Sequence, residues 1–284
     1  MNILLPKKVA RRAIVYLLVF IFSAIAIFPI LWIISCSLKP PEEIYAYPPS
    51  LVPENPTLEN FGRLLEIRGG QGNMYIATLN SLKVTVPALL ICLTISALGG
   101  YYLSRSRSRI KSRALFFIFF VQLVPAIVLI IPLYVWFAGM GLIDNLMALT
   151  IAYQSFLVPL STAFMKDYFD SIPSELEEAA MIDGCSRFSA LIKVILPLAS
   201  PGIVSIAIYA FLHGWGEYLL SSILILTPPN RTVPLQLGGF IMEYTIDWGG
   251  IMAASVWALI PVILIYLFLQ RYFVAGLTGG AVKA

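Results

Sequence analysis

The sequence has few of the residues that a soluble enzyme needs. Of its 284 residues only 12% are charged, 59% are hydrophobic and a single one is histidine. A soluble domain has about 25% charged residues, so this chain cannot cover itself with polar groups and lipid must cover much of its surface. A single histidine cannot form a histidine-based metal site, and no Ser/His/Asp constellation is recognisable around it. We therefore expect an integral membrane protein with no catalytic residues and no bound metal.

Cysteine is also scarce. Cys36, Cys92 and Cys185 have neither the spacing of metal ligands nor the number that a disulfide framework requires. One alternative concerns Cys36, which follows a basic tail and an apolar run and resembles the lipidated cysteine of a lipoprotein signal. The apolar run is longer than the roughly 7 to 15 residues of a signal-peptide core. We therefore expect the first apolar segment to remain attached as a membrane span.

Long apolar runs are abundant instead. A helix needs about 20 apolar residues to cross a bilayer core of about 30 Å. Six such runs are Ala13 to Leu38, Met74 to Leu103, Ala114 to Phe137, Leu146 to Met165, Ile203 to Leu226 and Ile251 to Phe273. Their apolar residues are consecutive, whereas transmembrane strands alternate apolar and polar positions. The sequence predicts an all-α polytopic protein with six transmembrane helices. It predicts one membrane domain over residues 1–284, in which the second to sixth spans form a core at 74–273.

Lysine and arginine indicate the orientation, because cytoplasmic segments retain them. The basic residues gather in the N-terminal tail (Lys7, Lys8, Arg11, Arg12) and between the second and third runs (Arg105, Arg107, Arg109, Lys111, Arg113). Both segments should lie inside, and alternation then places 174–197 and the tail 274–284 inside and the proline-rich segment 39–73 outside. No soluble face collects basic residues, so the net charge of +4 reflects topology and no nucleic acid is expected as a partner.

The most polar interruption is Ser174 to Pro197, here called the inner loop. Ser174 and Glu177 have the spacing of a capping box, which predicts a short helix that begins there. Gly184 should end this helix with a positive φ. A second helical piece from Ser186 to about Ile195 should stop before Pro197. Two short helices at an angle would form a docking surface below the membrane.

The inner loop resembles a known motif. Glu178-Ala179-Ala180, three residues, Gly184, nine residues and then Val194-Ile195-Leu196-Pro197 is similar to the EAA loop of permeases in binding-protein-dependent ABC importers, with valine in place of the usual first isoleucine. Further matches resemble the MalG-type carbohydrate permeases. They are Asn80-Ser81-Leu82, Tyr101, Arg105, Ile131-Pro132-Leu133-Tyr134, Ser171-Ile172-Pro173, Gln270-Arg271-Tyr272-Phe273-Val274 and the tail from Gly276 to Lys283.

The resemblance implies a type I ABC importer permease fold in the inner membrane and the import of mono- or oligosaccharides such as maltodextrin-like glycans. It implies an extracytoplasmic sugar-binding protein, a second permease subunit in a heterodimer and two ATP-binding subunits that hold ATP and Mg. This chain has no G-x-x-x-x-G-K-[ST] phosphate loop, so no cofactor is expected on it. The implied ATPase contacts are Glu178, Ala179, Ala180, Gly184, Leu196 and Pro197, with Gly276, Thr278, Gly280 and Lys283 in the tail. The alternatives are a connector with ordinary caps and a frayed tail.

Polar residues inside spans are expensive and often functional. His213 and Glu217 are four residues apart, a spacing that places two residues on the same face of a helix. Glu217, Trp215 and His213 are candidates to line the transport pathway; the alternatives are an internal ion pair or hydrogen bond between helices for Glu217 and an interfacial or core position for Trp215. Gln122 and Gln154 are expected to join helices by hydrogen bonds.

Two other functions remain open. An ion-coupled secondary transporter would need several acidic residues near the bilayer midplane and inverted repeats, and Glu217 is the only clear intramembrane acid. The other is an ABC importer for a different cargo, either glycerol phosphate or peptide. A phosphate cargo would ask for cations facing the cavity, and only Lys83 offers one within a span. In MalG-like permeases the segment that corresponds to 227–250, here called the outer loop, projects into the binding protein, although its glycines and prolines also fit ordinary turns.

Overall fold

The computed structural model describes residues 7–66, 73–108, 110–241 and 246–281. Apart from one isolated bridge, every regular element in those ranges is a helix, which confirms the all-helical prediction. The longer helices are α1 (Lys7–Ser37), α4 (Met74–Arg105), α5 (Ile110–Gln122), α6 (Ala126–Gly139), α8 (Gln154–Asp170), α12 (Ser200–Trp215) and α15 (Trp248–Ala281). The shorter ones are α2 (Pro41–Ile44), α3 (Glu59–Leu65), α7 (Leu146–Ala152), α9 (Glu175–Ile182), α10 (Arg187–Ala190), the π-helix η1 (Leu191–Ile195), α11 (Leu196–Leu198), α13 (Leu219–Leu224), the 3-10 helix η2 (Pro228–Asn230) and α14 (Val233–Gly238).

Four segments are long and apolar enough to cross a membrane as they stand. They are Arg11–Ser37, Met74–Arg105, Leu146–Asp170 and Trp248–Leu269. Two more candidates are bent pairs, Ile110–Gln122 with Ile127–Gly139 at 99° and Arg187–Leu198 with Ser200–Trp215 at 76°. If each pair is one span, the total over the described residues is six, the predicted number.

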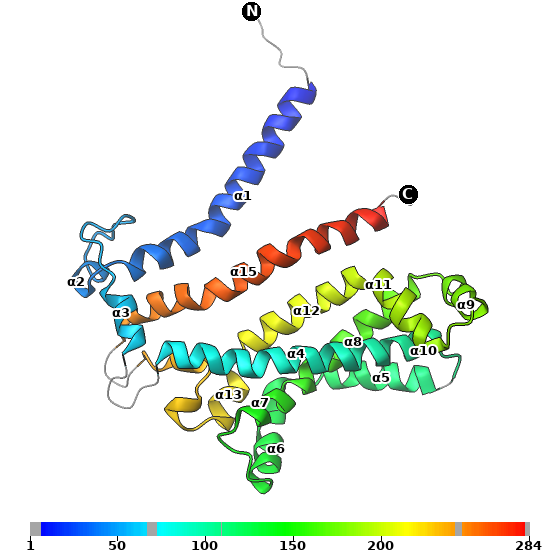
Figure 1. Ribbon diagram of the computed structural model, residues 1–284. Helices are drawn as coiled ribbons and strands as arrows, with labels where there is room; N and C mark the ends of the chain where they lie inside the picture. The colour runs from blue at the N-terminus through cyan, green and yellow to red at the C-terminus, as the bar shows by residue number, and fades with distance from the viewer. Residues whose placement is uncertain (1–6, 67–72, 109, 242–245, 282–284) are drawn as a thin grey trace, which may run out of the picture. The chain divides into compact units, whose positions relative to one another are not determined.

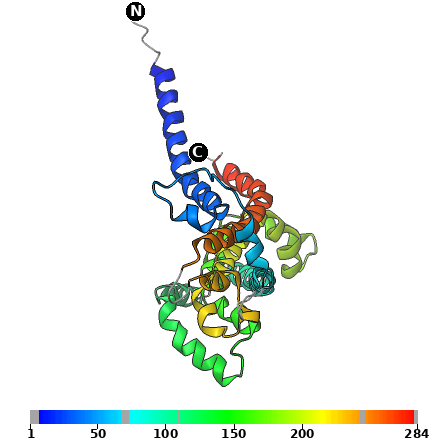
Figure 2. The ribbon, with the colours of Figure 1, turned by 90° about the vertical axis from the view of Figure 1, so that its left-hand side faces the viewer.

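Two of the predicted spans are not the continuous helices that their apolar composition indicated. The run from Ala114 to Phe137 breaks at Pro125, and α6 leaves the direction of α5 at a steep angle (Figure 2). Proline lacks an N–H and disfavours helical backbone in the residue before it, which is why the chain turns there. The run from Ile203 to Leu226 breaks at Gly216, where α12 ends, and resumes as α13. Apolar composition marks membrane depth but does not detect such breaks.

The chain divides into two compact units. The first contains residues 1–66 and 240–259. In it residues 40–56, which hold the prolines of the segment 39–73, form only the single turn of α2. The side-chain amide of Asn60, on α3, donates to the carbonyls of Ser37 at 2.9 Å and Lys39 at 2.8 Å. Arg63 of α3 pairs with Asp247 at 2.9 Å. Helix α3 is therefore bonded to both of the sequence segments that make up this unit.

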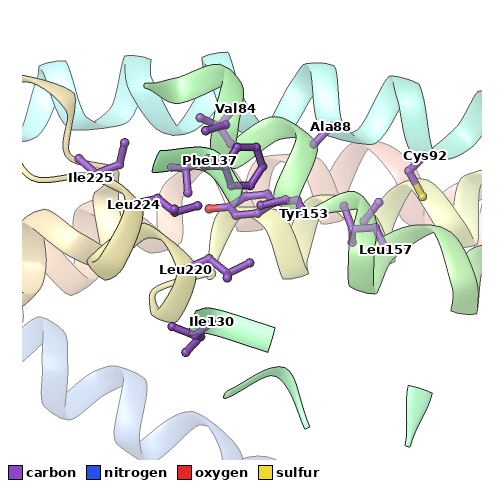
Figure 3. Packing of buried hydrophobic residues seen from close by; sticks show 14 residues of the cluster. Val84, Ala88, Cys92, Ile130, Phe137, Tyr153, Leu157, Leu220, Leu224 and Ile225 are labelled. Carbon is purple, nitrogen blue, oxygen red and sulfur yellow. The ribbon is translucent and has the colours of Figure 1, made fainter. Parts of the chain in front are cut away.

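The second unit contains residues 67–239 and 260–284 and is built around α4. Helix α4 packs against α8 along much of its length, and also against α7 and α12 (Figure 1). One buried cluster surrounds Tyr153, which lies between Val84 on α4 and Leu224 on α13 (Figure 3). A second cluster joins Phe169 of α8 to Ile195 of η1. The inner loop is therefore seated on the same packed helices that form the interior of this unit.

Glycine permits the closest of these contacts. A Cβ on Gly100 of α4 would lie 2.6 Å from the Met165 Cβ and 2.8 Å from the Lys166 backbone nitrogen, both on α8. A Cβ on Gly202 of α12 would lie 2.6 Å from the Tyr168 ring, also on α8. Real Cβ atoms do not approach that closely, so these two glycines set the separation of α4, α8 and α12 at the end of the unit nearest the inner loop.

Candidate functional site

The first helix of the inner loop begins without the predicted cap. Ser174 has helical backbone angles, φ −68° and ψ −23°, and its side chain accepts no capping hydrogen bond. The capping-box prediction is therefore wrong. Its physical reason is that Glu177 points to other partners, described below. The start of α9 is still favourable, because Glu175, Glu177 and Glu178 place negative charge at the positive end of the helix dipole.

The end of α9 is a Schellman motif, as the glycine predicted. Gly184 has φ +89°. Its N–H donates to the Met181 carbonyl at 3.1 Å, and the Cys185 N–H donates to the Ala180 carbonyl at 3.0 Å. These two bonds satisfy carbonyls that the helix end leaves free, and they require a left-handed residue at position 184. Gly184 is thus the residue that sets the angle between the two halves of the loop.

The second half of the loop is longer than predicted. The Ser186 hydroxyl accepts from the Ser189 N–H at 3.2 Å and caps α10. The helical path then runs through η1 and includes Pro197 before it ends at Leu198, so the predicted stop before Pro197 is wrong. Proline lacks the N–H for a regular helical bond, and the wide π-turn directly before it is the kind of local adjustment that accommodates the missing bond.

The expected ATPase-contact residues divide into exposed and packed ones. Glu178, Ala179, Gly184 and Pro197 are exposed, and Ala180 is half-buried. Leu196 packs against the cluster that contains Ile195. Beside them lie two apolar side chains that the sequence did not single out, since a motif match does not report exposure: Ile182 is 86% exposed and Phe188 is 63% exposed. Large exposed apolar side chains on a polar loop mark an interaction surface.

Glu177 ties the inner loop to α4. Its side chain is 4% exposed and accepts from the Tyr101 hydroxyl at 2.5 Å and from Arg105 Nε at 3.1 Å. Arg187 of α10 approaches the same carboxylate at 3.4 Å, and Arg105 also donates to the Ile172 carbonyl at 3.0 Å. A buried carboxylate is stable only when it is paired and hydrogen-bonded. This carboxylate therefore joins α9, α10 and the C-terminal end of α4.

The other end of α4 holds the start of the outer loop. The Asn80 amide donates to the carbonyls of Pro229 at 2.8 Å and Arg231 at 3.1 Å. The hydroxyl of Ser81 accepts from the Val233 N–H at 2.8 Å. The motif Asn80-Ser81-Leu82, noted for its resemblance alone, thus has a structural task that the sequence did not reveal: it fixes η2 and α14 against α4.

Asp144 holds the beginning of the same outer loop from the α6–α7 connection. It has φ +60°, a conformation that aspartate tolerates better than most residues. Its carboxylate accepts from the N–H groups of Leu226 and Thr227, each at 3.0 Å, and from the Thr227 hydroxyl at 2.6 Å. Burial raises the pKa of Asp144, but the hydrogen bonds from Thr227, Leu226 and Asn230 outweigh it, and the pKa lies below its ordinary value.

The three expected pathway residues lie in different environments. Helix α12 ends at Trp215, so His213 and Glu217 do not share a helix face and that expectation is wrong. Glu217 accepts from the N–H groups of Leu220 at 2.7 Å and Ser221 at 3.1 Å, and Tyr153 donates to it as well. Trp215 is 4% exposed and its ring stacks on Phe211. The His213 side chain is exposed. A pathway role for these residues stays a prediction.

Two further predictions concern Gln154 and the C-terminal tail. The Gln154 amide donates to the Ala88 carbonyl of α4 at 3.2 Å, which confirms that Gln154 joins helices. Gly276, Thr278 and Gly280 fall in the last turns of α15, whose side chains lie outside the described part, and Lys283 lies outside the described residues.

Known proteins resemble the chain over nearly all of its length. It is 34% identical to the diacetylchitobiose uptake system permease protein DasC of Streptomyces coelicolor over 90% of this chain and 92% of the relative. It is 31% identical to the trehalose/maltose transport system permease protein MalG of Thermococcus litoralis over 98% and 99%. The crystal structure of a bacterial ABC transporter involved in the import of the acidic polysaccharide alginate contains a similar chain, with a TM-score of 0.77, 25% identity and coverage of 96% and 100%.

These relatives confirm the resemblance to MalG-type permeases that the sequence motifs indicated. Residues 93–279, which include the whole inner loop, match the family described as "Binding-protein-dependent transport system inner membrane component". With the membrane-length helices, the inner loop and this match taken together, the chain belongs to the family of inner membrane components of binding-protein-dependent transport systems.

Proposed function

We propose that the chain is the transmembrane permease subunit of an ATP-driven, binding-protein-dependent importer of sugars. The observation that carries the proposal is the inner loop, an exposed helix–turn–helix with small residues at its tip and a buried anchor behind them. Two relatives of the chain are named for diacetylchitobiose and for trehalose and maltose, and a similar solved structure is named for alginate. Saccharides are the cargo class that these names share.

The chain supplies the membrane pathway and two partner subunits supply the energy. Those subunits bind ATP and Mg, since this sequence has no phosphate loop of its own. Their closure moves the inner loop, and the loop moves the helices on which it is seated. Coupling of this kind requires contacts that differ in free energy between the inward-open and outward-open states.

The inner loop offers two kinds of contact to an ATPase subunit. Ala179, Ala180 and Gly184 present little side-chain bulk, so a partner backbone can approach closely. Ile182 and Phe188 flank them with exposed apolar area, which releases water when it is buried. Glu178 adds a charge at the rim. The tail residues Gly276, Thr278, Gly280 and Lys283 provide a second contact, and both chain termini lie on the ATPase side.

The complete importer contains a second permease chain, forming a heterodimer with this one, and an extracytoplasmic sugar-binding protein. The binding protein docks on the opposite face, where Asn80, Ser81 and Asp144 hold the start of the outer loop in place. Fixed backbone segments are suitable for docking because little ordering entropy is lost when the partner binds.

Uptake by reconstituted vesicles tests the proposal. The full complex in proteoliposomes, with ATP inside and the loaded binding protein outside, should accumulate labelled oligosaccharide. Omission of ATP should stop this accumulation. Uptake driven by a proton or sodium gradient without ATP would contradict the proposal and support a secondary transporter. Accumulation of glycerol phosphate or peptide in preference to every sugar would contradict the cargo class only.

A further inference from the structure

The inner and outer loops are attached to opposite ends of one helix. Asn80 and Ser81 hold the outer loop near the N-terminal end of α4, and Tyr101 and Arg105 hold Glu177 near its C-terminal end. From Asn80 to Arg105 an α-helix rises by about 38 Å, at about 1.5 Å per residue, which is comparable to the thickness of a bilayer. A single rigid element therefore connects both loops.

Helix α4 differs from its neighbours in how it reaches the inner loop. Helices α8 and α12 flank that loop in the sequence, so the backbone itself carries its motion to them. Helix α4 is separated from the loop by residues 106–173, and the contacts described between the two are made by side chains. Among the described contacts, the buried Glu177 carboxylate supplies the ionic part of that attachment.

The body of α4 is packed well enough to move as a unit with α8. Gly100 brings the two backbones into close contact, the Cys92 thiol donates to the Ser161 hydroxyl at 3.2 Å, and Gln154 bonds the Ala88 carbonyl. On α4 these three links span residues 88–100, from the middle of the helix toward its C-terminal end. Close-packed interiors transmit displacement instead of absorbing it.

We propose, building on the function above, that α4 transmits motion between the binding-protein side and the ATPase side. Glu177 is the positioning residue of the contact between α4 and the inner loop, here called the ATPase-side joint. Asn80 and Ser81 form the joint on the other side. When the binding protein displaces the outer loop, α4 shifts, and the Glu177 joint passes that shift to α9 and α10. In the reverse direction, closure of the ATPase subunits pulls on α4 through the same carboxylate.

The test measures ATP hydrolysis by the reconstituted complex as a function of the concentration of cargo-loaded binding protein. Glu177→Gln should lower the maximal stimulated rate by roughly tenfold, within the range usual for coupling between sites. It should leave the binding-protein concentration for half-maximal stimulation unchanged, and the ATPase subunits should co-purify in normal amount. Glu175→Gln, an exposed glutamate on the same helix, is the matched control and should behave as the wild type.

A double-mutant cycle separates a joint from a merely stabilising contact. Because Glu177 and Arg105 act as one pair, Glu177→Gln with Arg105→Gln should reduce stimulation no further than either change alone. Asn80→Ala should instead raise the half-maximal binding-protein concentration. Where Glu177→Gln does not assemble, Tyr101→Phe removes one hydrogen bond and keeps the ion pair, and it should lower the maximal rate by a smaller factor.

Several results would overturn the inference. They are wild-type stimulation in both Glu177→Gln and Tyr101→Phe, additive losses in the double variant, or an Asn80→Ala variant unchanged in both quantities. A wild-type complex that shows no response to the loaded binding protein would contradict the proposed function itself. The two failures are therefore distinguishable in the same experiment.

Discussion

Replacement of Gly184 by alanine isolates the conformation of the inner loop from its chemistry. A Cβ at this position meets no atom within 4 Å, so the change introduces no clash. The whole cost arises from φ +89°, which an alanine adopts only at about 1–2 kcal/mol. That free energy lowers the ratio of native to alternative loop conformations by a factor of about 5–30. We expect the affinity for the ATPase subunits to fall by up to the same factor, because only the native loop binds them.

Gly141 provides a control with the same strain elsewhere. It has φ +68° in the α6–α7 connection, and a Cβ there also meets nothing within 4 Å. Gly184→Ala and Gly141→Ala should therefore lower the Tm of the purified permease by similar amounts. Only Gly184→Ala should weaken equilibrium binding of the ATPase subunits. Unchanged binding by Gly184→Ala, with the same loss of Tm as the control, would refute the reasoning.

Three further changes test other parts of the structure. Asp144→Asn should destabilise the protein by about 1–3 kcal/mol near neutral pH. Because the folded-state pKa of Asp144 lies below its ordinary value, its stabilisation is present above that ordinary value and is lost as the pH falls through the folded pKa. The Tm difference between variant and wild type should therefore vanish in acid, and a constant difference would contradict this assignment. Gly202→Ala should destabilise by about 1–3 kcal/mol because its Cβ would lie 2.6 Å from the Tyr168 ring, whereas Gly139→Ala on α6, with no atom within 4 Å, should not lower the Tm. Glu217→Ala should cost about 0.5–2 kcal/mol in thermal stability by removing the acceptor for the Leu220 and Ser221 amides, and a change in the KM for cargo in the same variant would support a pathway role.

The sequence predicts the features that depend on composition or on backbone sterics. Apolar runs of membrane length identify the helical fold, and Gly184 marks the left-handed turn in the inner loop, because only glycine adopts that conformation without strain. Gln154 is expected to join helices because a polar amide in a span needs a partner, and it does so with α4.

What the sequence misses depends on contacts between distant segments. Ser174 and Glu177 fit a capping box, but Glu177 is drawn to Tyr101 and Arg105, more than 70 positions earlier. No local pattern reports such a competitor. The breaks at Pro125 and Gly216 were missed for a different reason: proline and glycine are common in membrane helices, and Pro87 lies within the unbroken α4. Position within the packed structure decides which of them interrupts a span.

We propose that ATPase work reaches this subunit through the inner loop of a sugar importer. The most direct test of this proposal is ATP hydrolysis by the reconstituted complex with and without sugar-loaded binding protein, in the intact chain and in Gly184→Asp. We expect stimulation by sugar in the intact complex, and loss of that stimulation in Gly184→Asp when the ATPase subunits are present at concentrations that saturate its weakened binding. Undiminished stimulation in an assembled Gly184→Asp complex would contradict the proposal.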